Sequence, residues 1–437
     1  MRSRQGVILQ EEATSMKFLS GRLRWVLISL IFVISAIAYM TRVNMSVAGQ
    51  SLMNEYHWNN VQLGYVLSAF ILGYGLFQAP GGRLADRFGP RIVIPIGVLI
   101  WCVGTSLTAF VPANLPITLL IMIVVQSLVG VGQAVVFPAS NRLVAAWIPT
   151  AERGIANGFI FSGVGFGSAI TPPLITFVLV DLGWKWSFQI CALIGLVIIF
   201  LWWFLARDTP EKHPSISKKE LHLIEAGLPA KTAQKPLPWA TIVKDKQVIL
   251  LSLSYFTFGY AVYIFFTWFF IYLNKVRGLD LKSSSYYAML PFLAMMVGSP
   301  AGGWVADRVV KRYGKRIGRC GLGLVALSGG AVFIAFATQI ASVGISTVFL
   351  SLGAGSIYFG MSSYWAVTAD IAGASAGSVS GLMNMLAQIG GASASILTPL
   401  IGDHAGWTPS FLVAAGLCVF GAIAWLFINP NARLLSK

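Results

Sequence analysis

Charged residues are scarce in this sequence. Only 11% of its 437 residues are Asp, Glu, Lys or Arg, whereas 56% are hydrophobic and the mean hydropathy is +0.75. Soluble domains carry charge on about 25% of their residues, so the composition excludes an ordinary soluble domain. We therefore predict an integral membrane protein whose main partner is the lipid bilayer.

The side chains that usually perform catalysis or bind metals are also few. The sequence has 15 Asp and Glu, 4 His and 4 Cys, and no acid or histidine lies in the middle of an apolar run. An enzyme in the membrane would need a convergent set of acid, base, nucleophile or metal ligands. The cysteines are scattered singly, which predicts neither a disulfide framework nor a metal site. We expect no enzymatic activity, no cofactor and no metal.

Long apolar runs are present along the whole chain. A helix needs about 20 apolar residues to cross the hydrocarbon core, and every crossing segment should be helical because lipid cannot satisfy backbone hydrogen bonds. The first run is too long for a cleavable signal peptide and carries Arg42. Twelve runs qualify: 24–48, 61–82, 90–111, 116–140, 153–178, 186–206, 247–274, 285–306, 318–338, 341–367, 376–402 and 408–428.

Basic residues alternate between the segments that join these runs. Of the 31 Lys and Arg, all but five lie in the N-terminal segment, in every second connection and in the C-terminal segment. The positive-inside rule then places both termini in the cytoplasm. The net charge of +16 is explained by loops that face an anionic leaflet, so we expect no nucleic-acid partner.

One motif occurs twice. Gly-Gly-Arg-Leu-Ala-Asp-Arg at 81–87 and Gly-Gly-Trp-Val-Ala-Asp-Arg at 302–308 both follow the second run of a set of six. This registry predicts a parallel repeat of two halves. We expect an N-terminal half at 1–206, a cytoplasmic linker at 207–246 and a C-terminal half at 247–437. Within the linker, residues 216–228 favour either a short amphipathic surface helix or a solvated tether.

The repeated motif resembles the signature loop of the major facilitator superfamily. Further pieces resemble its anion:cation symporter family, which includes bacterial D-galactonate and other sugar-acid carriers and, more distantly, sialin and the vesicular glutamate transporters. These pieces are 42–48, 137–141, 147–153 and 370–372. The resemblance implies an all-α membrane protein of twelve transmembrane helices in two six-helix halves. It also implies gating roles at the cytoplasmic side for Asp86, Arg87, Asp307, Arg308 and Asp370.

Arg42 is the one cation that lies inside an apolar run. It is about 27 Å along its helix from Arg24 at 1.5 Å per residue, so it either faces an interior cavity or extends toward the outer leaflet. A guanidinium binds a planar carboxylate with two parallel hydrogen bonds and stays protonated. Tyr39 and Ser46 lie on the same helical face. These residues predict an anionic substrate.

The resemblance adds further candidates for the substrate site and shows some departures. Tyr74, Trp365 and Asn384 match positions that line the sugar-acid site of the galactonate carrier, and Thr267 and Trp268 match a similar stretch of the seventh helix. Gln126 and Gln133 are assigned to the same site. The departures are Thr41 and Gln133 where the bacterial carriers have membrane acids, Gln126 where they have an arginine, and Val164 where they have a glutamine.

The predicted function is secondary active transport of a small organic anion, a carboxylate or sugar acid, by alternating access and in the direction of uptake. The alternatives are an anion exchanger and a multidrug exporter. The family suggests a proton as the coupling ion, but its proton-carrying acids are missing here. The substrate then carries its own proton or exchanges for another anion, or Asp370 titrates at a gate. We expect a monomer in the bacterial inner membrane.

Overall fold

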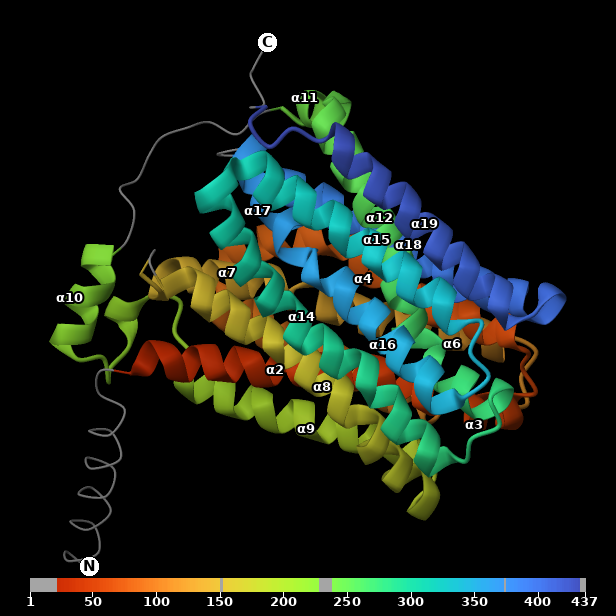
Figure 1. The fold of residues 1–437 in the computed structure, drawn as a ribbon. Helices are drawn as coiled ribbons and strands as arrows, with labels where there is room; N and C mark the ends of the chain where they lie inside the picture. The colour runs from red at the N-terminus through yellow and green to blue at the C-terminus, as the bar shows by residue number, and fades with distance from the viewer. Residues whose placement is uncertain (1–21, 150–151, 228–237, 373–374, 433–437) are drawn as a thin grey trace, which may run out of the picture.

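The structure is a computed structural model that describes residues 22–149, 152–227, 238–372 and 375–432, apart from the side chains of Asp86 and Arg153. The described elements are helices (Figure 1). In the first half of the chain the helices long enough to cross a membrane are α2 (Leu23–Val47), α4 (Asn60–Phe88), α5 (Pro90–Thr108), α6 with α7 (Thr118–Ala134 and Val136–Trp147), α8 (Arg153–Asp181) and α9 (Trp184–Leu205).

The second half of the chain repeats this order. Its crossing elements are α12 (Lys246–Thr267) continued by α13 (Phe269–Ile271) and η3 (Tyr272–Val276), α14 (Leu281–Lys315), η4 (Arg316–Gly321) with α15 (Leu322–Ala337), α16 with α17 (Val343–Phe359 and Met361–Ala372), α18 (Ala376–Ala405) and α19 (Trp407–Phe427). Among the described residues, four short helices lie outside the crossings: α3 (Gly49–Tyr56), η2 (Pro210–Lys212), α10 (Lys218–Gly227) and α11 (Trp239–Lys244).

One helical stretch contains two crossings. In the described residues, 11 stretches are long and apolar enough to span a membrane, and the longest covers 57 residues from Leu281 to Ala337. A straight helix of that length would measure about 85 Å, whereas the hydrocarbon core is about 30 Å thick. Gly314, with φ of 84°, breaks the stretch near the end of α14, before the next crossing begins. The prediction of twelve transmembrane helices is therefore confirmed.

The two copies of the repeated motif do not form loops, although the family signature that they resemble is described as one. Residues 81–87 and 302–308 are helical and extend α4 and α14 beyond the apolar run. The chain turns only afterwards, at Gly89 and Gly314, whose φ values are 82° and 84°. A left-handed backbone is accessible to glycine without steric cost. Hydropathy marks where a helix leaves the lipid, and it does not mark where the helix ends.

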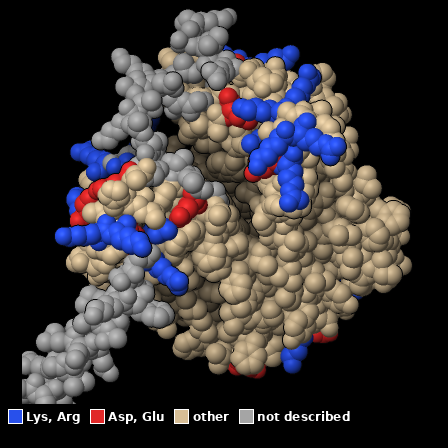
Figure 2. Space-filling model, turned by 60° about the vertical axis from the view of Figure 1, so that its left-hand side comes forward, with Lys and Arg blue, Asp and Glu red and all other residues tan. Residues whose placement is uncertain are grey.

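The two ends of the helical bundle differ in charge. We call the end that carries α10 and α11 the linker face; it lies at the upper left of Figure 1, and α3 lies at the opposite face. Figure 2 views the linker face and shows Lys and Arg gathered around a hollow, whereas the sides of the molecule carry few charges. The start of α2 and the segment after α19 both lie at the linker face, because Glu220 of α10 binds Leu23 and Gln247 binds Asn429.

The linker is fixed to the start of α2. Glu220 accepts hydrogen bonds from the backbone N–H groups of Leu23 and Arg24, both at 3.2 Å, and from the Arg24 guanidinium at 3.2 Å. Glu152 binds the other side of the same guanidinium at 3.1 Å. Backbone N–H groups at a helix start lack partners within the helix, so the carboxylate of Glu220 serves as their cap. Helix α10 is docked to the bundle and is not a free tether.

The two halves of the chain meet through two close helix pairs. A Cβ at Gly64 of α4 would overlap the backbone oxygen of Ser395 in α18, and one at Gly165 of α8 would lie 2.7 Å from the Cβ of Met296 in α14. Toward the opposite face, Asn60 donates to Asp403 at 2.7 Å and Ser46 donates to the Thr267 carbonyl at 2.6 Å. The halves are therefore in contact at the opposite face. The boundaries of the halves at 206 and 247 stay a prediction.

Candidate functional site

A central cavity opens between the two halves at the linker face. Its volume is about 600 Å³. Arg83, Trp239 and Ser378 line it near the linker-face ends of their helices, and Tyr39 and Gln388 line it deeper in the bundle. Figure 2 shows the hollow at this face. A cavity of this size is in the range of sites that hold small molecules.

Arg42 lies just beyond the deep end of the central cavity. The residue is only 8% exposed, and it lines a second, small pocket of about 20 Å³. Tyr263 and Phe266 line both the small pocket and the central cavity, so they separate the guanidinium from the larger space. Arg42 therefore faces the interior of the bundle. The alternative in which it extends to the outer leaflet does not apply.

The contacts of Arg42 leave part of its guanidinium free. Its Nε donates to Oε1 of Gln133 at 2.9 Å, and Gln133 in turn donates to the Ala38 carbonyl at 3.2 Å. The guanidinium carbon lies 4.2 Å from the ring centre of Tyr39 and 4.1 Å from that of Tyr74. Its Nη2 is buried and has no hydrogen-bond partner among the described residues. A third ring, that of Phe70, has its centre 5.0 Å from the same carbon, so three aromatic rings and one amide hold the cation in place.

No carboxylate in the described part of the chain forms an ion pair with Arg42. Burial of a charge without a counter-charge is costly, and an arginine near the centre of a membrane helix costs about 2.5–3.5 kcal/mol. A buried Nη2 without a partner, on a residue that lines a small pocket, and an uncompensated positive charge together suit an anion as the missing partner.

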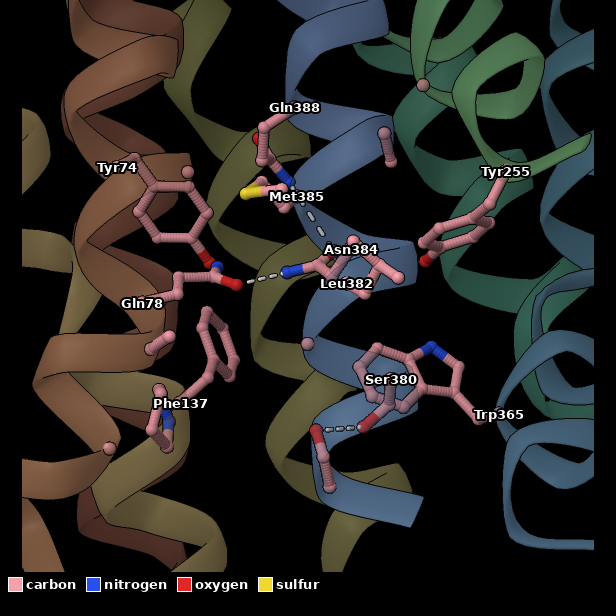
Figure 3. Close-up of a pocket in the computed structure, with 18 of the residues that line it drawn as sticks. Tyr74, Gln78, Phe137, Tyr255, Trp365, Ser380, Leu382, Asn384, Met385 and Gln388 are labelled. Atoms are coloured by element: carbon pink, nitrogen blue, oxygen red, sulfur yellow. Dashed lines mark hydrogen bonds between the residues drawn. The ribbon is translucent and has the colours of Figure 1, made fainter. Parts of the chain in front are cut away.

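One wall of the central cavity is a chain of amides that joins the two halves. Asn384 of α18 donates to Gln78 of α4, and Gln388 donates to Oδ1 of Asn384 at 3.5 Å. The Tyr263 hydroxyl donates to Oε1 of Gln388 at 2.6 Å. Figure 3 shows Gln78 and Asn384 reaching toward each other across the space between α4 and α18. The oxygen of each of the three amides therefore accepts a hydrogen bond from another residue of this wall.

Another wall is aromatic. The ring centres of Tyr39 and Phe137 lie 6.4 Å apart, those of Phe137 and Phe161 lie 5.4 Å apart, and those of Phe161 and Trp365 lie 6.4 Å apart. All four residues line the central cavity. The Nε1 of Trp365 is buried without a hydrogen-bond partner among the described residues. These rings form a continuous surface that begins beside Arg42, and we call it the aromatic track.

The predicted substrate residues fall into three groups. Tyr39, Tyr74, Trp365 and Asn384 line the central cavity, and Arg42, Gln126 and Thr267 line the small pocket. Gln133 lines neither and instead holds Arg42.

Three of the expected polar groups are already engaged. The hydroxyl of Thr267 donates to the Tyr263 carbonyl at 2.6 Å, and Gln126 donates to Thr108 at 2.9 Å. The Ser46 hydroxyl, which was expected to lie beside the arginine, is taken by the Thr267 carbonyl. The assignment of these residues to a substrate site stays a prediction.

The predicted gating residues lie at the linker face and not in the central cavity. Asp370 pairs with Lys315 at 2.6 Å and with Arg319 at 3.8 Å, and Arg319 also pairs with Asp307 at 3.4 Å. This cluster ties the end of α14 to the end of α17. In addition, Arg308 stacks on Trp304 and Arg87 on Phe88. The side chain of Asp86 lies outside the described residues, and the gating role of all five stays a prediction.

Several lining residues escaped the sequence prediction. Gln78 and Gln388 each lie one helical turn from a predicted residue, four positions after Tyr74 and Asn384. Since residues four apart share a helical face, that spacing is the signal that would have found them. Phe137 lies in the segment 137–141 that resembles the family, although no substrate role was assigned to it. Phe161 and Tyr263 carried no comparable signal, because aromatic residues are frequent along these helices.

Comparison with known proteins gives one match by family profile. The profile described as the Major Facilitator Superfamily matches residues 30–395. This range covers most of the chain and includes every predicted substrate residue.

Individual relatives match over nearly their whole length. A probable sulfoacetate transporter of Cupriavidus necator is 34% identical over 398 residues, which is 90% of this chain and 91% of that protein. The hexuronate transporter of Bacillus subtilis is 29% identical over 92% of this chain and 93% of that protein. A bacterial homologue of the human lysosomal transporter Spinster, in an inward-facing and unoccupied conformation, has the same fold. Its TM-score is 0.75 at 16% identity, with 94% of this chain and 97% of that chain covered.

Proposed function

The chain belongs to the major facilitator superfamily, and from that premise we propose that it moves a small organic anion across a membrane by alternating access. As a member of this superfamily it is a multi-pass membrane transporter and not an enzyme. The two relatives named above are transporters of organic acids, which supports an anionic cargo. The cargo is a carboxylate or a related acid.

The observation that carries this proposal is the unpaired guanidinium of Arg42. It is buried, it has a free N–H, and no described carboxylate neutralises it. A carrier of cationic drugs would need an acid here, whereas an anion would restore neutrality. Charge-assisted hydrogen bonds between a guanidinium and a carboxylate are about twice as strong as neutral ones, so this one residue is a sufficient anchor.

The second support is the shape of the cavity. It opens at the linker face and is blocked at the opposite face, where Asn60 and Ser46 bind the other half. We propose that the linker face is cytoplasmic, because most basic residues lie there, and that this state is the inward-open one. Both termini are then cytoplasmic and the membrane is the bacterial inner membrane. The proposed direction is uptake.

The separation of Arg42 from the central cavity affects how an anion can bind. Tyr263 and Phe266 separate the two spaces, so an anion that enters from the linker face must displace these rings to reach the guanidinium. Tyr263 is also bonded to Gln388, which leads through Asn384 to Gln78 of the other half. Binding at Arg42 therefore disturbs a chain of hydrogen bonds that connects the two halves.

Transport of the anion can be driven in two ways, by symport with a proton or by exchange for another anion. The described residues place no Asp, Glu or His in contact with Arg42, and Thr41 donates its hydroxyl to the Ile37 carbonyl within its own helix. Symport then requires a proton carried by the substrate or bound elsewhere, and Asp370 is engaged by Lys315. Exchange of one anion for another needs no titratable group and is the second candidate function.

The test is uptake into proteoliposomes. Labelled sulfoacetate, D-glucuronate and benzoate are offered to the wild type, to Arg42→Ala and to Arg312→Ala, which removes an exposed arginine of the linker face. We expect uptake of at least one anion that Arg42→Ala abolishes and Arg312→Ala retains. Transport at the wild-type rate by correctly inserted Arg42→Ala would overturn the assignment.

The same vesicles distinguish the two versions of coupling. Proton, voltage and counter-anion gradients are imposed one at a time. Stimulation by an inward proton gradient alone supports symport and refutes exchange, whereas stimulation only by an anion loaded inside the vesicle supports exchange.

A further inference from the structure

We propose that the cargo is an aromatic monocarboxylate, an anion with one negative charge on a planar ring. This inference rests on the proposed function, because it specifies which organic anion fits the cavity at Arg42. Three properties of the cavity support it: its charge, its aromatic track and the state of its amides.

The charge of the cavity fits one carboxylate. Among the described residues, Arg42 is the one buried cation beyond the deep end of the central cavity, and Arg83, the arginine that lines the cavity itself, is exposed near the mouth. One carboxylate neutralises Arg42. A second carboxylate on a small substrate would be buried among aromatic rings with no cation beside it, which is unfavourable.

The aromatic track begins at the cation. The Tyr39 ring packs on the guanidinium, and from Tyr39 the ring contacts lead through Phe137 and Phe161 to Trp365. Figure 3 shows Phe137 and Trp365 on the two sides of the space below the bridge between Gln78 and Asn384. Aromatic pairs favour ring centres 4.5–7 Å apart. A planar ring attached to a carboxylate would stack along this track with its charge toward Arg42.

The amides offer little to a cargo with many hydroxyl groups. Gln78, Asn384 and Gln388 are bonded to one another and Gln388 also binds Tyr263. An open-chain sugar acid carries a hydroxyl on almost every carbon. On the aromatic side these hydroxyls would lose their water and find few partners, chiefly Nε1 of Trp365 and the hydroxyl of Tyr39. A polar group buried without a hydrogen bond is penalised.

The test is the affinity of the purified wild-type protein for four matched anions, measured by isothermal titration. Benzoate has a ring and one charge, cyclohexanecarboxylate has a similar size and one charge but no aromatic ring, terephthalate has a ring and two charges, and D-gluconate is a polyol with one charge. We expect benzoate to bind about 2- to 10-fold more tightly than cyclohexanecarboxylate. The difference in affinity between benzoate and either terephthalate or D-gluconate should be larger.

Variants of α8 assign the preference to the track. Phe161→Leu should lower the affinity for benzoate about 2- to 10-fold and leave the affinity for cyclohexanecarboxylate nearly unchanged. Phe161→Tyr should retain the preference for benzoate because it keeps an aromatic ring. Phe177→Leu removes a phenylalanine from the same helix that is 69% exposed and faces away from the cavity, so it should bind as the wild type does.

The outcomes separate this inference from the proposed function. If D-gluconate or terephthalate binds as tightly as benzoate and Arg42→Ala abolishes that binding, the aromatic class is wrong and the anion carrier stands. The wild-type affinities decide this even if a variant fails to fold. If no anion binds and none is taken up, the proposed function fails as well.

Discussion

Gly64 and Gly73 provide a test of alternating access within one helix. Both are on α4, and at each a Cβ would meet a backbone oxygen. At Gly64 the oxygen belongs to Ser395 of α18, in the other half, whereas at Gly73 it belongs to Ser127 of α6, in the same half, at 2.5 Å. The two alanine substitutions therefore create similar crowding, but only Gly64→Ala creates it between the halves.

The expected size follows from that crowding. Extra atoms in a packed interface cost about 1–3 kcal/mol. In Gly64→Ala the strain is relieved when the halves separate at the opposite face, so the ratio of outward-open to inward-open protein should rise about 5- to 150-fold, at 1.4 kcal/mol per tenfold. In Gly73→Ala no movement of the halves relieves the strain. That variant should lose thermal stability and keep the wild-type distribution of states.

The assay is pulsed electron spin resonance between spin labels on Asn54 and Ala405, which are exposed at the opposite face on the two halves. The wild type should show mainly the short distance of the closed face. Gly64→Ala should add a longer distance, and Gly73→Ala should not. Equal distributions in the two variants would refute the conclusion that α4 and α18 form the contact that opens.

Three further predictions concern packing and the linker. Gly302→Ala places a Cβ onto a backbone oxygen of α16, whereas at Gly303 the nearest atom is 3.6 Å away. Gly302→Ala should therefore lower the melting temperature and Gly303→Ala should not. Equal melting temperatures of the two variants would contradict the packing role of Gly302. Glu220→Gln should weaken the docking of α10 to the bundle by about 3 kcal/mol and so increase hydrogen exchange in α10. Unchanged hydrogen exchange would show that the charge of Glu220 does not hold the linker. Burial lowers the pKa of His213, whose Nδ1 accepts the Ser215 N–H at 3.1 Å. The folded state therefore binds the proton less well than the unfolded state, so linker docking should weaken as the pH falls below about 6.5. Hydrogen exchange of the linker at pH 8 and pH 5.5 tests this, with His213→Gln expected to lose the pH dependence.

The crossings and the family could be predicted because both depend on local signals. Apolar length identifies a transmembrane helix, and the motif at 81–87 and 302–308 identifies the superfamily. The ends of α4 and α14 could not be predicted from hydropathy, since a helix continues beyond the lipid until a residue such as Gly89 ends it.

The site could be predicted only in part. Arg42 was found because a buried cation is rare in a membrane helix. Its contacts with Gln133 and the ring of Tyr74 depend on how α4 and α6 pack against α2, which no local pattern encodes. The docking of α10 also escaped prediction, because it depends on one carboxylate of Glu220 meeting the start of α2.

The central claim is that Arg42 binds the transported anion. The most direct test is the dissociation constant of the best transported anion for the wild type, Arg42→Lys and Arg42→Ala, measured at one pH. A charged hydrogen bond contributes about 1.5–3 kcal/mol, so Arg42→Ala should bind about 10- to 150-fold more weakly. Arg42→Lys should lie between, since it keeps the charge and loses the planar fork. Equal affinities in all three proteins would contradict the claim.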